Sequence, residues 1–166
     1  MIPFERIYLD TNIFIFAVEG SDKVSGLLSE LLIRAEVRPG MLFTSEVTIA
    51  ELLVKPLKFQ DNDLIKAFDN LVFCNKAVRV SPLPPMAYRY AAALRSHRAS
   101  IKLPDALHLG AAMAGNASHF LTLDTGIAPP LDLGNLRIID NQPDVDLDII
   151  RPELPTLEAL LKSLIS

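Results

Sequence analysis

The sequence contains one cysteine, Cys74, among its 166 residues, so no intrachain disulfide can form. A lack of disulfides agrees with a reducing compartment. No window reaches the roughly 18 consecutive apolar residues that a membrane-spanning helix needs, and residues 1–6 lack the pattern of a signal peptide. We therefore expect a cytoplasmic protein without a membrane span. The apolar neighbours Val72 and Phe73 predict that the Cys74 thiol is buried.

Positive charge and nucleotide-binding loops are also scarce. The chain has 16 Lys and Arg against 20 Asp and Glu, a net charge of -4. Proteins that coat nucleic acids neutralise phosphates with Lys and Arg, so this balance argues against that class. It leaves open a local nucleic-acid site whose positive charge comes from metal ions. The chain has no glycine-rich phosphate loop and no His/Cys spacing typical of zinc sites.

The chain does have the length and apolar content of one ordinary globular domain, since half of its residues are hydrophobic. Helical patterns alternate with short apolar, β-rich runs, which predicts an α/β fold with a mainly parallel sheet. Strands are expected at 7–9, 41–44, 78–80, 119–123 and 136–140. Helices are expected at 24–35, 46–54 (stopping before Pro56), 62–73, 85–97, 104–115 and 157–165.

Asp10 directly follows the first buried strand and begins the polar triplet Asp10-Thr-Asn12. In open α/β sheets the carboxyl ends of the strands face the ligand crevice. A carboxylate there is costly unless it is paired, hydrogen-bonded or bound to metal. The alternative is that Asp10 or Thr11 only caps the following helix, and the sequence leaves both interpretations open.

Glu51 lies among apolar residues on both sides, within a helix for which Ser45 is the expected N-cap. It could belong to the exposed stripe of an amphipathic helix. That stripe would also contain Val47 or Val54, which favours a buried and functional Glu51.

Asp105 and Asp124 are two further carboxylates in notable positions. Pro104 fits the first position of a helix, which places Asp105 in the first turn, where the helix dipole favours an anion. The rest of this helix is rich in Ala, Gly and Leu, as in closely packed helices. His108, one turn on, is expected to be a hydrogen-bonded core histidine and not a ligand. Asp124 follows a late strand and repeats the pattern of Asp10.

These four carboxylates are expected to converge, because strand ends and helix N-termini share one edge of a parallel sheet. Carboxylates placed together repel one another and take up protons. Mg²⁺ or Mn²⁺ with oxygen ligands removes that penalty. Such a centre suits in-line hydrolysis of a phosphodiester without a nucleophilic Ser, Cys or Lys.

The four motifs resemble those of PIN-domain nucleases, and among these the chain looks most similar to VapC-type toxins of bacterial and archaeal toxin–antitoxin pairs. The resemblance covers residues 6–140. It implies a three-layer α/β/α fold with a mainly parallel, about five-stranded sheet, and a Mg²⁺- or Mn²⁺-dependent endoribonuclease. It also implies a homodimer and a protein antitoxin that occupies the groove of the toxin.

By match of position, the resemblance makes Asp10, Asp105 and Asp124 metal ligands, and Glu51 a ligand directly or through water. Asn12 and Thr122 would position the site by hydrogen bonds. The basic patch of Arg95, Arg98 and Lys102 becomes a candidate contact for RNA phosphates, although a patch of this size is usually a solvated face.

The resemblance divides the chain into a PIN-like nuclease domain, 1–140, and a proline-rich acidic tether with a short amphipathic helix, 141–166. Asn141 to Pro155 is expected to have little regular structure, and Thr156 to cap the last helix. The apolar stripe of that helix must pack on this domain, a second copy or a partner. Many relatives carry one more acid after the last aspartate, which Thr125-Gly-Ile127 does not supply, so the number of metal ions stays open.

Two other functions are compatible with parts of this pattern. A haloacid-dehalogenase-like phosphatase also begins with a strand followed by aspartate, but it needs a second aspartate where this chain has Asn12. The other rival is a catalytically inactive PIN-like module that binds RNA or protein. Carboxylates at all four motif positions weigh against that module.

Overall fold

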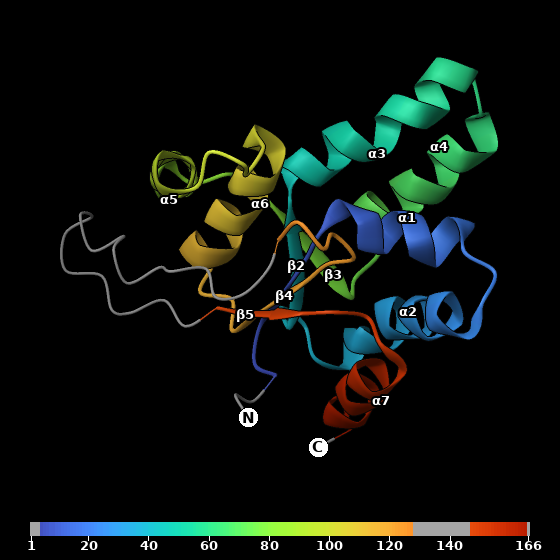
Figure 1. Ribbon diagram of the computed structural model, residues 1–166. Coiled ribbons are helices and arrows are strands. Elements are labelled where there is room, and N and C mark those ends of the chain that lie inside the picture. The colour runs from blue at the N-terminus through green and yellow to red at the C-terminus, as the bar shows by residue number, and fades with distance from the viewer. Residues whose placement is uncertain (1–3, 128–146, 166) are drawn as a thin grey trace.

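A five-stranded, all-parallel sheet with strand order β3-β2-β1-β4-β5 forms the centre of the molecule (Figure 1). The computed structural model describes residues 4–127 and 147–165. Its strands are β1 (Ile7–Leu9), β2 (Leu42–Ser45), β3 (Val78–Ser81), β4 (His119–Leu121) and β5 (Asp148–Ile150). The predicted mainly parallel sheet is therefore confirmed.

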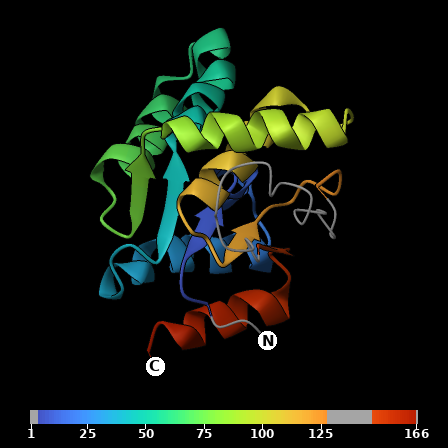
Figure 2. The same ribbon diagram turned by 90° about the vertical axis from the view of Figure 1, so that its left-hand side faces the viewer.

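Helices cover both faces of the sheet and complete the predicted three-layer α/β/α architecture. One face carries α1 (Thr11–Glu19), α2 (Lys23–Arg34), α3 (Glu46–Phe59), α4 (Asn62–Asp69) and α7 (Leu154–Ser163). The other carries α5 (Pro85–His97) and α6 (Leu103–Ala114), the side that Figure 2 looks onto. Two irregular turns, Ala35–Val37 and Asn70–Cys74, extend α2 and α4.

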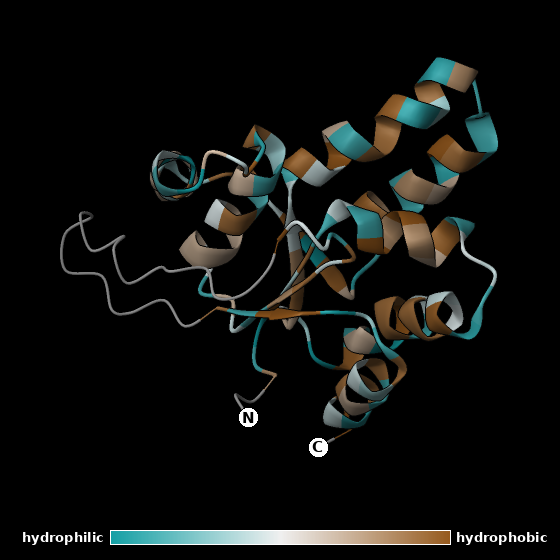
Figure 3. Cartoon of the chain, viewed as in Figure 1, coloured by the Kyte–Doolittle hydropathy of each residue, from teal (hydrophilic) through white to brown (hydrophobic). Residues whose placement is uncertain are grey.

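The alternation of side chains along the short strands builds two hydrophobic cores. Ile7 and Leu9 point to the core under α1, α2 and α7, whereas Tyr8 points to the core under α5 and α6. All three are fully buried, which explains why the first strand is apolar on both faces. Figure 3 shows hydrophilic and hydrophobic bands alternating along α3 and α4, as expected of helices with one buried face.

Two local predictions on this side of the molecule are wrong. The helix that begins at Glu46 continues through Pro56 to Phe59, and ends where Gln60 adopts a left-handed conformation with φ of 55°. Pro56 is buried, so packing offsets the hydrogen bond that its nitrogen cannot donate. Cys74 is exposed, because the Asn70–Cys74 turn directs Val72 to the core and leaves Phe73 and Cys74 outside.

The C-terminal segment is more regular than predicted. Asp148–Ile150, within the expected tether, pairs with β4 as the fifth strand, so the tether prediction is wrong there. The strand expected at 136–140 lies outside the described residues. The last helix begins at Leu154, with Glu153 and not Thr156 at its cap.

The apolar stripe of α7 packs within the same chain, since Leu157 and Leu160 are fully buried in the core shared with α2. In the parts of the chain that the structure describes, no helix combines the length and the apolar character needed to cross a membrane.

Candidate metal centre

Asp10 lies at the carboxyl end of the central strand β1 and is 7% exposed. Its Oδ1 accepts a hydrogen bond from the Thr11 amide at 2.7 Å, and it occupies the N-cap position of α1. Its Oδ2 accepts from Asn12 Nδ2 at 2.7 Å and from the Thr122 hydroxyl at 2.6 Å. Asp10 therefore caps a helix and also presents a buried carboxylate at the carboxyl ends of the strands.

Thr122 and Asn12, the two predicted supporting residues, lie against Asp10. The fully buried Thr122 hydroxyl accepts from Asn12 Nδ2 at 3.1 Å and from the Asp124 amide at 2.9 Å. Asn12 Oδ1 accepts from the Leu123 amide at 3.0 Å. These bonds lock the β1–α1 junction to the segment after β4, so the Asp10 carboxylate and the Asp124 backbone share one rigid frame.

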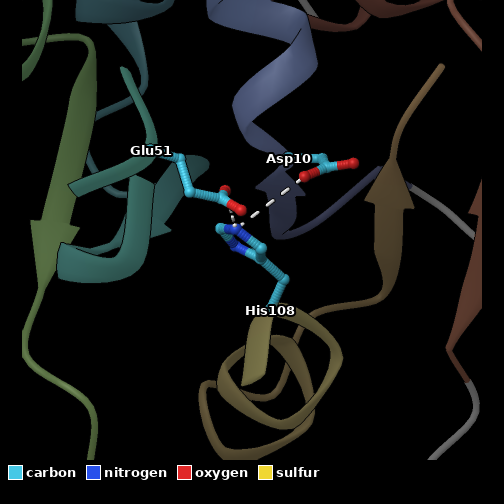
Figure 4. A group of neighbouring side chains, drawn as sticks. All are labelled: Asp10, Glu51 and His108. Carbon is cyan, nitrogen blue, oxygen red and sulfur yellow. Dashed lines mark hydrogen bonds and ion pairs between the residues drawn. The ribbon is translucent and has the colours of Figure 1, made fainter. Parts of the chain in front are cut away.

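Glu51 comes from α3 and points toward Asp10 and His108 (Figure 4). Its side chain is 35% exposed, so it is half-buried and not buried as expected. Its Oε2 accepts from the Thr11 hydroxyl at 2.5 Å and from His108 Nε2 at 2.7 Å. The hydrogen bond from His108 is the largest cause that lowers the pKa of Glu51, against the opposing effect of burial. Glu51 is thereby kept ionised.

His108, on α6, is 1% exposed and hydrogen-bonded through both ring nitrogens. Because a carboxylate only accepts, Nε2 carries the hydrogen toward Glu51, and Nδ1 accepts from the Tyr8 hydroxyl at 2.8 Å. Tyr8 in turn shares a 2.7 Å hydrogen bond with the Ser45 hydroxyl, and burial raises the pKa of Tyr8. This arrangement agrees with the expected hydrogen-bonded core histidine.

Sequence reasoning missed Tyr8, Thr11 and Ser45 as parts of this network. The available signal was the one hydroxyl in an otherwise apolar first strand. Ser45 occupies the predicted N-cap position of α3, but its hydroxyl serves Tyr8 and makes no cap hydrogen bond.

Asp105 lies in the first turn of α6, as predicted, and is half-buried. Burial raises the pKa of its carboxyl, and the negative charges of Asp124, Asp10 and Glu51 raise it further, in that order. Asp124 is also half-buried, and its Oδ1 accepts from the Gly126 amide at 2.8 Å. The fold thus brings Asp10, Glu51 and Asp124 close enough to Asp105 for their charges to act on its carboxyl.

The tightest group of ligand atoms among the described residues belongs to Asp10, Glu51 and His108, all within 4.8 Å of one another. His108 Nε2 is committed to Glu51 and lies 3.9 Å from Asp10 Oδ1. The remaining donors are carboxylate oxygens, the ligands that Mg²⁺ and Mn²⁺ prefer. The raised pKa of Asp105 is an electrostatic cost that a bound cation would remove, so the residues present fit such an ion.

The predicted basic patch lies on the connection from α5 to α6. Arg95 is exposed in the last turn of α5, and Lys102 is exposed at the cap of α6, three residues before Asp105. Arg98 is partly exposed between them. The three side chains are therefore wholly or partly exposed in the segment that precedes Asp105 in the chain.

Comparison with solved structures shows the same fold. VapBC2 of Rickettsia felis, bound to a DNA fragment from its promoter, has a TM-score of 0.60 at 17% identity over 87% of this chain and 97% of that chain. A toxin–antitoxin complex of Klebsiella pneumoniae has a TM-score of 0.54 at 19% identity, over 89% and 98%. DNA-bound VapBC of Salmonella typhimurium has a TM-score of 0.58 at 17% identity, over 89% and 98%.

No curated protein matches the chain in a sequence search. A family model described as PIN domain matches residues 7–129, which include Asp10, Glu51, Asp105 and Asp124. This match covers well over half of the chain, and it spans every carboxylate of the candidate centre. The chain belongs to the PIN domain family.

Proposed function

We propose that this protein is a metal-dependent endoribonuclease that hydrolyses RNA phosphodiester bonds and acts as the toxin of a toxin–antitoxin pair. The observation that carries the proposal is the gathering of four carboxylates from separate motifs: burial raises the pKa of Asp105, and the charges of Asp124, Asp10 and Glu51 raise it further. Membership in the PIN domain family supports the same reading.

In this proposal Asp10, Asp105 and Asp124 hold Mg²⁺ or Mn²⁺, and Glu51 holds it directly or through water. The bound cation would lower the pKa of the attacking water and offset charge on the phosphate. Asn12 and Thr122 keep the Asp10 carboxylate in one orientation through the bonds to Oδ2.

The other residues have distinct tasks. Thr11 and His108 both donate to Glu51 Oε2, which fixes its rotamer and maintains its charge. Arg95, Arg98 and Lys102 would contact RNA phosphates on the approach to Asp105. None of these tasks needs a nucleophilic side chain.

A protein antitoxin is the proposed partner. The solved structures from Rickettsia felis and Klebsiella pneumoniae are a VapBC2 assembly and a toxin–antitoxin complex, and they share the fold of this chain. The homodimer and the cytoplasmic location stay predictions.

The test is cleavage of a mixed pool of structured RNAs by purified protein with Mn²⁺ or with EDTA. We expect cleavage only with Mn²⁺, and a loss of roughly a hundredfold or more in Asp10→Asn, because removing one charged ligand weakens metal binding and charge stabilisation. Asp63→Asn, an exposed aspartate of α4, is the matched control and should cleave like the wild type.

Cleavage by Asp10→Asn at the wild-type rate would contradict the proposed centre. If the wild type neither cleaves RNA nor binds Mn²⁺ by calorimetry, the protein is instead the inactive PIN-like binding module.

A further inference from the structure

Three arginines from separate segments line one cleft near the amino ends of the central strands, away from Asp10. Arg6 precedes β1, Arg38 precedes β2 and Arg79 lies in β3. The cleft has a volume of about 450 Å³, and Glu5 contributes the single negative charge to its lining. In a chain with a net charge of -4, three positive charges therefore concentrate at one cleft.

No ion pair among the described residues, 4–127 and 147–165, neutralises these arginines. Arg38 Nη1 donates to the Ser163 carbonyl at 2.8 Å, and the Arg6 guanidinium lies 4.5 Å from the centre of the Phe43 ring. The Nε of Arg6 is buried and has no hydrogen-bond partner in the described parts of the chain. Such a donor is costly unless a ligand accepts from it.

A second cavity, of about 240 Å³, adjoins the first and shares Arg6 and Arg79 with it. Strand register explains why Arg79 also lines the second cavity: Arg79 in β3 is paired with Phe43 in β2, which lines that cavity. The further lining includes Tyr8, Phe43 and Ser45, which are almost fully buried, and Ser81, Pro82 and Pro84, which are partly or fully exposed. An arginine-rich cleft thus adjoins a cavity whose exposed lining includes two prolines and a serine.

We propose that the two cavities together bind a ribonucleotide, at a site separate from the carboxylates. The phosphate would lie among Arg6, Arg38 and Arg79, because guanidinium groups donate paired hydrogen bonds to phosphate oxygens. The planar base would lie in the second cavity, where the exposed prolines Pro82 and Pro84 offer apolar contact and the partly exposed Ser81 offers a hydroxyl for hydrogen bonding. The ligand is a free mononucleotide or one nucleotide of an RNA strand, and both present the same chemistry.

The site does not depend on the proposed nuclease activity, so the test excludes metal. Isothermal calorimetry in EDTA would measure binding of AMP, CMP, GMP and UMP, each alone, to the wild type and to Arg79→Glu. Arg79 is exposed on the edge strand, so this change leaves the core intact. We expect a loss of affinity of roughly tenfold or more, because one charge-assisted contact becomes a repulsion.

Lys66→Glu, at an exposed position of α4, makes the same change in net charge and should bind like the wild type. Arg38→Ala is a second variant in the cleft, also expected to bind more weakly. Asp10→Asn should retain binding, which separates this site from the carboxylates. Inorganic phosphate should compete with the bound nucleotide.

Binding of a 5′-phosphorylated tetraribonucleotide and of its unphosphorylated counterpart shows whether the bound phosphate belongs to a free nucleotide or to an RNA strand. Binding of the mononucleotides alone identifies a free nucleotide as the ligand, and binding of the tetranucleotide identifies an RNA strand. Absence of binding to every probe would overturn the proposal. So would equal affinities of the wild type, Arg79→Glu and Arg38→Ala, or a loss of binding in Asp10→Asn.

Discussion

His108 Nε2 donates to Glu51 Oε2 over 2.7 Å, and this bond ties α6 to α3 across the candidate metal centre. The other ring nitrogen accepts from the Tyr8 hydroxyl, so the imidazole links a buried hydroxyl to a half-buried carboxylate. A residue outside the carboxylate set thus holds one of the four carboxylates in place.

His108→Ala should lower the free energy of unfolding of the metal-free protein by about 2–4 kcal/mol, since it leaves a cavity and deprives the buried Tyr8 hydroxyl of its acceptor. Urea denaturation measures this change. His97→Ala, at an exposed position, should stay within about 0.5 kcal/mol of the wild type. Affinity for Mn²⁺ should also fall roughly tenfold or more, because Glu51 loses its partner. Unchanged stability and affinity would refute the role of the bond.

Thr122→Val keeps the shape of the side chain but removes the hydroxyl that bonds Asp10, Asn12 and the Asp124 amide. We expect a loss of about 1–3 kcal/mol in the free energy of unfolding, because buried polar groups lose their partner. Thr125→Val, at an exposed position, is the matched control. Equal denaturation midpoints for both variants would show that the hydroxyl network adds nothing to stability.

Asp105→Asn should stabilise the metal-free protein at pH 7. The pKa of Asp105 is raised in the folded state, so the wild type loses stability as the pH rises from the ordinary value of 3.8 through the raised one. The variant escapes this loss, and after discounting for solvent screening its Tm should be about 1–3 °C higher at pH 7. The difference should shrink as the pH falls toward 3.8.

Saturating Mn²⁺ should instead give the wild type a higher Tm than Asp105→Asn. The reason is that the wild type keeps all four carboxylates and therefore binds the ion more tightly. Differential scanning calorimetry with EDTA and with Mn²⁺ measures both effects. A variant that is less stable than the wild type in EDTA at pH 7 would contradict the electrostatic explanation.

Gly110→Ala tests the packing of α6 on α5. A Cβ at Gly110 would lie 2.3 Å from the backbone oxygen of Ala87, so the helices would have to move apart. We expect a loss of about 1–3 kcal/mol in the free energy of unfolding. Gly26→Ala in α2, where a Cβ meets nothing within 4 Å, should instead gain up to about 1 kcal/mol through helix propensity. Similar effects of the two changes on the urea midpoint would contradict this packing.

Much of the fold follows from local patterns in the sequence. The apolar runs at 7–9, 78–80 and 119–123 predict strands, and the amphipathic spacing of 24–35 and 85–97 predicts helices, because each pattern depends on neighbours along the chain. Asp10 and Asp124 could be placed at a sheet edge for the same reason: both follow an apolar run. The parallel sheet and its three layers were predictable at this level.

The exceptions are positions where distant packing overrides a local rule. Pro56 stays helical because its ring is buried, and Asp148–Ile150 becomes a strand because β4 offers an open edge. Cys74 is exposed because the turn after α4 rotates it outward. Nothing within a few residues of these positions carries that information.

The sequence by itself determined the order of the elements, the carboxylates and the family motifs. Only the tertiary structure decided that His108 holds Glu51, that Tyr8 and Ser45 support His108, and that Arg6, Arg38 and Arg79 share a cleft. Periodicity along the chain sets the face of a strand or helix on which a side chain lies. Strand register and helix packing set which of these faces pack against each other. Such packing brings together residues such as Tyr8 and His108, which lie 100 positions apart in the chain.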